Sequence, residues 1–221
     1  MLIGIETTIR ILLINPNTSV ATTEQMTAIA QAVAPGAKII GVTARRGPPM
    51  ILSAEELAAA APEVVALALA EVPNVDGIIV GAFGDPGLPA LREQINLPVV
   101  GIAEASMLEA AEGGRRFGVA TTTPALVELI ATRAHELGVA HLYVGIRLTS
   151  GDPLTLVADP ERLVDALAEA VRQSIRRDGA EAVIIGGGPL GQAAIALAPR
   201  FTTPIIPPIP AAVRRLMQAM A

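Results

Sequence analysis

Short apolar runs alternate along this chain with alanine-rich or amphipathic stretches, and turn residues separate the two kinds of segment. Short apolar runs between turns are typical of buried strands, and the longer stretches are typical of helices. The alternation predicts an α/β fold with parallel strands. Strands are predicted at 9–15, 38–43, 77–81, 99–102, 117–120, 141–147, 182–186 and 205–206. Helices are predicted at 22–34, 53–70, 89–93, 104–112, 124–137, 160–177, 190–198 and 211–220.

The pattern is also duplicated. Residues 75–91 and 180–191 each contain an acidic residue, an apolar run and a glycine-rich turn, which pairs Ala82 with Gly187. Two similar halves predict two pseudo-symmetric parallel-sheet lobes with a ligand cleft between them. We expect the first lobe to comprise residues 1–103 with a returning C-terminal helix at 205–221, and the second to comprise 104–204. A single doubly wound sheet is the alternative.

Composition narrows the classes of protein that fit. Hydrophobic residues make up 52% of the chain but aromatic residues only 2%, which suits a parallel sheet covered on both faces. The net charge of −5 argues against a nucleic-acid partner. No apolar run reaches the roughly 20 residues that span a bilayer, and the start lacks the pattern of a signal peptide. We expect a cytoplasmic protein with no membrane partner that forms a homo-oligomer.

The turns after the strands are the expected place for a ligand. In open α/β sheets, ligands bind at the carboxyl ends of the strands. The turns there precede helices, whose N-terminal N–H groups favour anions. Several such turns converging would bind a small carboxylate or an enolate. The selected turns are 15–19, 82–88, 101–105, 121–123 and 187–191.

Polar residues concentrate in two of these turns. Asn15, Asn17 and Thr18 follow the first strand, and Thr121 and Thr122 follow the fifth. Such residues are also preferred as turn and helix-capping residues. They are therefore candidates for ligand contact, for capping, or for both.

Two acidic residues are the catalytic candidates. Asp85 lies in the turn after the third strand, where the alternative is an Asx-turn or a helix cap. Glu104 begins a predicted helix, where the alternative is a capped helix start or a structural ion pair. Either carboxylate could instead act near a reacting carbon.

The glycine-rich turn at 186–191 matches Gly-x-Gly-x-x-Gly after a strand. A dinucleotide site is a poor interpretation, because Pro189 removes one backbone donor and no acidic residue for a ribose follows about 20 residues later. The glycines instead favour close approach of a ligand to the backbone. No histidine–carboxylate group has metal-ligand spacing, so we expect neither a metal nor another cofactor.

Taken together and in order, these motifs resemble the aspartate/glutamate/hydantoin racemase family, most closely its hydantoin racemases. The resemblance covers nearly the whole chain and is carried by 15–19, 85–88, 101–105, 121–123 and 186–188. It implies a small carboxylate or a hydantoin-like cyclic amide as the partner. It also implies substrate contacts from Ala82, Phe83, Gly84, Gly187 and Gly188 as well as from the polar turns. It also implies two opposed cysteines, and the matching positions are Ala82 and Gly187. The chain contains no cysteine.

Racemisation by two bases needs an ionisable group on each face of the reacting carbon. The resemblance therefore leaves two functions open. One is a cysteine-independent isomerase, lyase or decarboxylase that uses Asp85, Glu104 or water. The other is a non-catalytic protein that binds small anions. Removal of the cysteines by design explains the pair less well, since a designed change would use Ala or Ser at both positions.

Overall fold

The computed structural model describes residues 8–221. Residues 1–7, to which the expectation about a signal peptide applies, lie outside the described residues. Four parallel strands form the first sheet in the order β2-β1-β3-β4. The central strand pairs Ile11 with Ile39 on one side and with Gly77 on the other. The strands are β1 (Arg10–Asn15), β2 (Lys38–Thr43), β3 (Gly77–Val80) and β4 (Val99–Gly101).

A second parallel sheet repeats this arrangement in the order β6-β5-β7-β8. In both sheets the first strand of the half lies between the second and the third, and the fourth follows the third. The prediction of two pseudo-symmetric lobes is thus confirmed, and the single doubly wound sheet is wrong. The strands are β5 (Phe117–Thr121), β6 (Tyr143–Leu148), β7 (Ala182–Ile185) and β8 (Ile205–Ile206).

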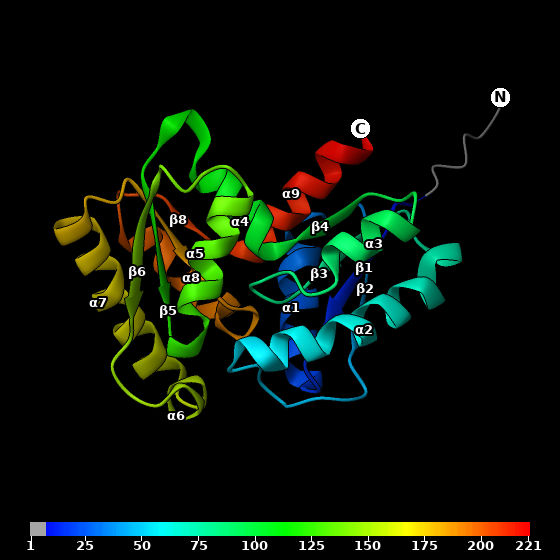
Figure 1. The fold of residues 1–221 in the computed structure, drawn as a ribbon, viewed down its shortest axis with the longest axis horizontal. Helices are drawn as coiled ribbons and strands as arrows, with labels where there is room; N and C mark the ends of the chain where they lie inside the picture. The colour runs from blue at the N-terminus through cyan, green and yellow to red at the C-terminus, as the bar shows by residue number, and fades with distance from the viewer. Residues whose placement is uncertain (1–7) are drawn as a thin grey trace.

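Helices connect the strands and cover both sheets (Figure 1). The α-helices are α1 (Val20–Val33), α2 (Ala54–Glu71), α3 (Leu88–Gln94), α4 (Ile102–Ala110), α5 (Val127–Glu136), α6 (Pro153–Val157), α7 (Pro160–Asp178), α8 (Gly191–Leu197) and α9 (Pro208–Met220). Single 3-10 turns are η1 (Val72–Asn74), η2 (Glu112–Gly114), η3 (Pro124–Leu126), η4 (Gly188–Leu190) and η5 (Ala198–Arg200). The pattern did not predict α6, because five residues are too few to show a helical period.

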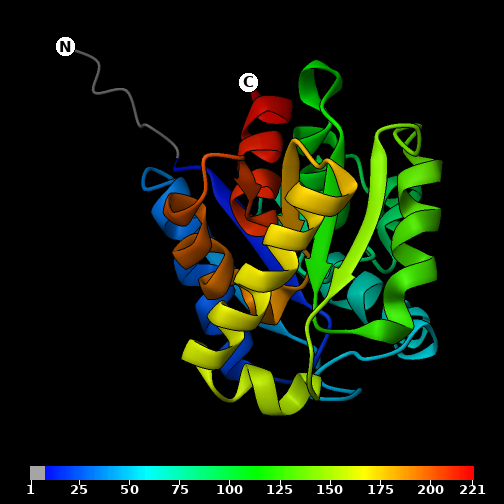
Figure 2. The ribbon, with the colours of Figure 1, turned by 90° about the vertical axis from the view of Figure 1, so that its left-hand side faces the viewer.

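One shared core joins the two halves. Leu13 and Ile79 of the first sheet belong to the same buried cluster as Val119 and Ile184 of the second. A separate apolar cluster covers the other face of each sheet. In Figure 2, α7 lies in front of the strands of the second sheet, which it contacts at β5, β6 and β7. The halves therefore pack face to face, which brings the carboxyl ends of their strands together.

The C-terminal segment is shared between the halves. Helix α9 packs on α1, β3 and β4 of the first half and also on α4. Strand β8 pairs with β7 in the second sheet, so the range 205–221 does not belong to the first lobe as a whole. Its apolar residues extend the second sheet just as β4 extends the first. Because α4 contacts β4, β7 and β8, a boundary at 103 and 104 stays a prediction.

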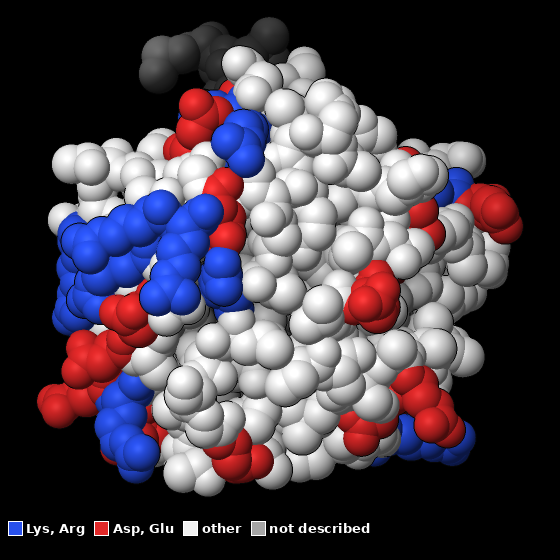
Figure 3. Space-filling view, turned by 60° about the vertical axis from the view of Figure 1, so that its left-hand side comes forward, with Lys and Arg blue, Asp and Glu red and all other residues white. Residues whose placement is uncertain are grey.

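Charged side chains are unevenly distributed on the surface of the second half. Figure 3 shows Lys and Arg gathered at one side of this face with acidic side chains next to them, while much of the face is uncharged. Arg172 of α7 pairs with Glu169 at 2.9 Å, and Arg147 pairs with Asp178. Local pairing of this kind is ordinary for a surface and marks no ligand. Among residues 8–221, no helix is both long and apolar enough to cross a membrane.

Candidate functional site

A cavity lies where the strand ends of the two halves meet, the place where open α/β sheets bind small molecules. The first half contributes the turns after β1 and β3 and the loop before α2, and the second half contributes the turns after β5 and β7. The lining residues are Asn17, Met50, Ile51, Leu57, Gly81, Ala82, Phe83, Thr121, Thr122, Thr123, Leu126, Ile130, Gly186, Gly187, Gly188, Pro189 and Leu190.

Asn15, the last residue of β1, and Asn17, in the turn that follows, have different positions relative to the cavity. Asn15 is buried behind it, and its Nδ2 donates to Asn17 Oδ1 at 2.8 Å and to the carbonyl of Ser19 at 3.0 Å. Asn17 Oδ1 also accepts from the N–H of Ser19 at 2.9 Å. Asn17 lines the cavity, and its Nδ2 makes no hydrogen bond to the described residues. Thr18, also predicted to contact the ligand, is absent from the lining and donates its N–H to the carbonyl of Pro48 at 3.1 Å.

Thr121, the last residue of β5, and Thr122, the residue after it, both line the cavity but differ in their hydrogen bonds. The hydroxyl of Thr121 donates to the carbonyl of Gly186 at 2.7 Å and so ties β5 to the turn after β7. The hydroxyl of Thr122 is buried and has no hydrogen-bond partner among the described residues. A buried polar atom without a partner is costly, so this hydroxyl is a site where a ligand atom can bind.

The turns at the two predicted cysteine positions abut one another. Ala82 and Gly187 line the same cavity from opposite halves. A Cβ on Gly188 would lie 2.7 Å from the carbonyl oxygen of Gly81, so only glycine permits this approach. Within residues 8–221, the N–H groups of Ala82, Phe83, Gly187 and Gly188 make no hydrogen bond. These N–H groups are available to donate to a carbonyl oxygen of a ligand.

Two of the predicted substrate-binding glycines, Gly84 and Gly187, have positive φ angles. Gly84, with φ +141°, is not part of the lining, and a Cβ built on it would overlap Leu57 and Leu129. Gly187 has φ +144° and ψ 135°, a conformation that L-residues with side chains rarely adopt. A side chain at position 187 would therefore strain the turn as it stands.

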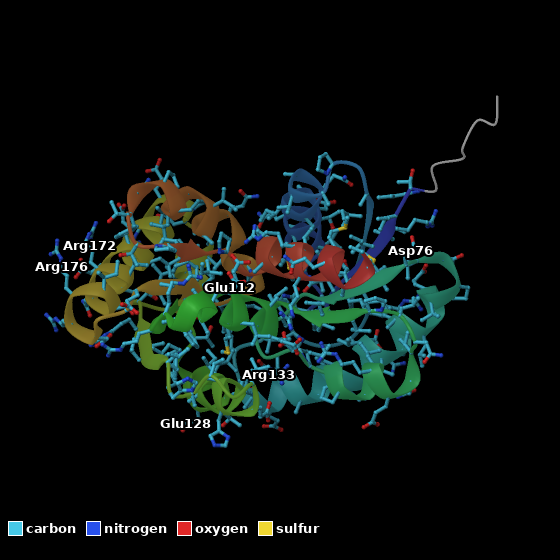
Figure 4. The ribbon with its side chains drawn as sticks, turned by 90° about the horizontal axis from the view of Figure 1, so that it is seen from above. Asp76, Glu112, Glu128, Arg133, Arg172 and Arg176 are labelled. Atoms are coloured by element: carbon cyan, nitrogen blue, oxygen red, sulfur yellow. The ribbon has the colours of Figure 1, made fainter. Side chains whose placement is uncertain are left out.

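The two predicted catalytic carboxylates lie outside the cavity lining and are bound to other groups. Asp85 accepts the N–H groups of Ala103 at 2.9 Å and Glu104 at 2.8 Å. Arg133, where the two halves meet in Figure 4, approaches Asp85 and Glu104 at 3.2 Å each. Arg92 adds a two-pronged contact to Glu104 at 2.8 and 2.9 Å. Asp85 thus caps the beginning of α4 and not of the helix that follows it, and Glu104 forms ion pairs. A catalytic role for either carboxylate stays a prediction.

Burial raises the pKa of Asp85 to about 6, while Arg133 and the two N–H groups act in the opposite direction. Only 1% of its side chain is exposed, so the carboxylate has almost no water to stabilise its charge. Its titration therefore falls near neutrality without contact to a ligand.

Sequence reasoning missed the apolar wall of the cavity and the arginine behind it. Met50 and Ile51 lie in the loop before α2, and Leu126 and Ile130 lie on the opposite side. The signal in the sequence was the apolar pair Met50 and Ile51 in a loop that otherwise contains prolines and arginines. Nothing in the helical pattern of α5 distinguished Arg133 from its exposed neighbours. In residues 8–221, no group of three or more His, Cys, Asp or Glu is placed to hold a metal ion.

Known proteins share this architecture. The family model of Asp/Glu/hydantoin racemases matches residues 11–216. A hydantoin racemase from Pseudomonas sp. (strain NS671) is 30% identical over 207 residues, covering 93% of this chain and 83% of the relative. An allantoin racemase from Klebsiella pneumoniae superposes with a TM-score of 0.89 at 34% identity, covering 96% of this chain and 87% of that one. An arylmalonate decarboxylase variant, 18% identical with a TM-score of 0.70, covers 97% and 93% and shares the fold alone.

Proposed function

Because this chain belongs to the Asp/Glu/hydantoin racemase family, we propose that it binds a small uncharged cyclic amide of the hydantoin type between its sheets and does not racemise it. The observation that carries this proposal is the cavity lining, which includes no charged side chain. A buried carboxylate without a cationic partner is costly, whereas an amide ring needs only hydrogen bonds. The lining thus favours a cyclic amide over the small carboxylate that is the other expected partner.

The polar groups of the cavity suit such a ring. Asn17 offers an NH₂ donor, and the N–H groups beside Ala82 and Gly187 offer donors from both halves. Carbonyl oxygens of a cyclic amide can accept from them. The free hydroxyl of Thr122 can accept a ring N–H or donate to a ring carbonyl. Both ring carbonyls then have donors, and Thr122 can accept one ring N–H.

The apolar wall indicates the substituent on the ring. Met50, Ile51, Leu126 and Ile130 offer no hydrogen bond to a polar side chain of the ligand. Burying a benzyl group there would contribute about 1.5–3 kcal/mol, while burying an unpaired ureido group would cost free energy. We therefore place an apolar substituent, rather than the ureido group of allantoin, against this wall.

Racemisation is left without a proton carrier. Ala82 and Gly187 hold no ionisable atom, and the other lining residues titrate at no ordinary pH. Asp85 and Glu104 are held by backbone N–H groups and arginines outside the lining. A positioned acid or base contributes roughly 10²–10⁴-fold to a rate, and here neither face of the ligand has one.

Calorimetry tests the binding part of the proposal. We expect 5-benzylhydantoin to bind roughly 10–100-fold more tightly than unsubstituted hydantoin, because the benzyl group leaves water. Allantoin and glutamate are expected to bind more weakly than 5-benzylhydantoin. Tight binding of glutamate with no response to either hydantoin would refute the cyclic amide as ligand.

Proton exchange tests the chemical part. In D₂O, we expect no catalysed exchange at C5 of L-5-benzylhydantoin and no loss of optical rotation beyond the buffer rate. The variant with both Ala82→Cys and Gly187→Cys should gain exchange, and either change alone should gain little. Because Gly187 has a positive φ, the double variant must first be shown to fold by circular dichroism. Catalysed racemisation by the unmodified protein would contradict the proposal.

A further inference from the structure

Asp85 does not line the cavity, yet its carboxylate joins the segments around one side of it. Its own N–H donates to the carbonyl of Ala82 at 3.0 Å, within the turn that lines the cavity. Its Oδ1 accepts from Ala103 at 2.9 Å and its Oδ2 from Glu104 at 2.8 Å, at the beginning of α4. Arg133 of α5 donates to Oδ2 through Nε at 3.3 Å and Nη2 at 3.2 Å. One carboxylate thus connects the turn after β3 with α4 and α5.

The backbone at this point depends on those contacts. Asp85 has φ +52°, and it is the one non-glycine residue of residues 8–221 with positive φ. Such a conformation costs free energy unless its surroundings hold it. A Cβ on Gly101 would overlap the carboxylate of Asp85, so the strand below is shaped to admit this group. The side-chain contacts of Asp85 therefore hold the turn that carries Ala82 and Phe83.

Charged groups face Asp85 directly from two helices and indirectly from two more. Helix α2 meets the glycines of the same turn with atoms of Leu57, Ala61 and Val65. The carboxylate thus has one cationic neighbour and one acidic neighbour of its own. The charged groups are Glu104 of α4, Arg133 of α5 with its second partner Glu136, and Arg92 of α3 and Arg215 of α9, which both contact Glu104.

We propose that Asp85 is a positioning residue that makes the shape of the ligand cavity depend on pH. The ionised carboxylate accepts from both N–H groups of α4 and from Arg133. When it takes a proton from water, one oxygen becomes a donor and faces groups that can only donate. The hold on the turn after β3 is then weakened. The pKa of about 6, raised by burial, places this change between pH 5 and 7.

Nuclear magnetic resonance tests the positioning role without any ligand. We expect the carboxyl carbon of Asp85 and the amide signals of Ala82 and Phe83 to titrate together, with a midpoint near pH 6. In Asp85→Asn the amide titration should vanish. In Asp178→Asn, which removes another carboxylate paired with an arginine, it should remain. The proposal is overturned if Asp85 does not titrate between pH 5 and 7, or if it titrates while both amides keep their shifts.

A second variant covers the case in which Asp85→Asn does not fold. Arg133→Met removes the cation that lowers the pKa of Asp85, so the midpoint of the amide titration should move to higher pH. An unchanged midpoint in this variant would contradict the coupling between Asp85 and Arg133. Circular dichroism establishes that each variant is folded before its titration is interpreted.

A binding experiment also tests the role of Asp85. It rests on the proposed function, but its failure can be distinguished from a failure of that function. Only about a tenth of Asp85 is ionised one pH unit below its pKa, so 5-benzylhydantoin should bind about tenfold more weakly at pH 5 than at pH 7. Asp85→Asn should bind weakly at both values. Equal affinity of the natural protein at both pH values would refute the positioning role. No binding of any hydantoin at any pH would refute the proposed function, and the amide titration would still decide the role of Asp85.

Discussion

The turn after β3 and the turn after β7 occupy equivalent places in the two sheets, but they are held in different ways. The first turn is anchored by a buried charge, because Asp85 bonds to α4 and to Arg133. Among the described residues, the second turn has no charged anchor of this kind and depends on backbone conformation, with Gly187 at φ +144° followed by the 3-10 turn η4. Its tie to the sheet is the neutral hydrogen bond from Thr121 to Gly186.

The duplication therefore extends to the strands and not to the site. The strand order is the same in both halves because buried apolar strands and their crossovers permit few arrangements. The turns are free of that constraint, so each half has acquired its own way of presenting N–H groups to the cavity. One half should respond to changes of charge, and the other to changes of backbone.

The largest effect is expected at Gly101, below the charged anchor. A methyl group there would overlap Asp85, so Gly101→Ala must push the carboxylate away from α4 and Arg133. Disrupting a buried charge pair costs on the order of 3–5 kcal/mol of unfolding free energy. Urea denaturation measures it. Gly36→Ala, where a Cβ meets no atom within 4 Å, is the control and should change stability little. Equal stability of both variants would show that the anchor can move freely.

The second turn should be broken by a change of backbone rather than of charge. Gly187→Ala puts a side chain at φ +144°, which costs about 1–3 kcal/mol, and places its Cβ 3.2 Å from Leu190. We expect it to weaken calorimetric binding of 5-benzylhydantoin without abolishing it, because the strained turn shifts the N–H groups beside the cavity. Gly145→Ala has a similar φ of +114° with no atom within 4 Å, and it should lose stability but keep binding. Loss of binding in both variants would trace the effect to stability alone.

The two threonines after β5 distinguish ligand contact from structural support within the second half. Thr122→Val removes a hydroxyl that has no partner among the described residues, so the ligand-free protein should not lose stability. Binding of 5-benzylhydantoin should weaken by about 1–2 kcal/mol, or roughly 5–30-fold, because one ligand hydrogen bond is lost. Thr121→Val breaks the bond to Gly186 and should instead lower stability by about 1 kcal/mol. If Thr122→Val binds normally, its hydroxyl does not contact the ring.

The sequence was sufficient to predict the strands of the two similar halves. It was insufficient to predict the contacts formed where the halves meet. Apolar runs such as the one that forms β7 predicted the strands, since buried parallel strands read as continuous runs between turns. The sequence placed Asp85 in the turn after β3. The position of its carboxylate depends on the space left by the missing side chain of Gly101, which no local pattern reveals. Arg133 lies 48 residues from Asp85 along the chain, so only the packing of the halves brings them together.

The smallest effect is the dependence of stability on pH, and its sign separates the charged turn from its neutral counterpart. The pKa of Asp85 is raised from 3.8 to about 6 in the folded protein, so the folded state binds more protons than the unfolded state between these values. The contribution to stability is present in full below pH 3.8 and is lost as pH rises through 6. The unfolding free energy of the natural protein relative to Asp85→Asn should therefore fall by about 1 kcal/mol from pH 5 to pH 7.

Thermal unfolding at both pH values measures this fall, with Asp178→Asn as a control that should not show it. A difference that rises with pH would mean that Arg133 and the N–H groups of α4 outweigh burial, so that the folded protein is more stable with Asp85 ionised.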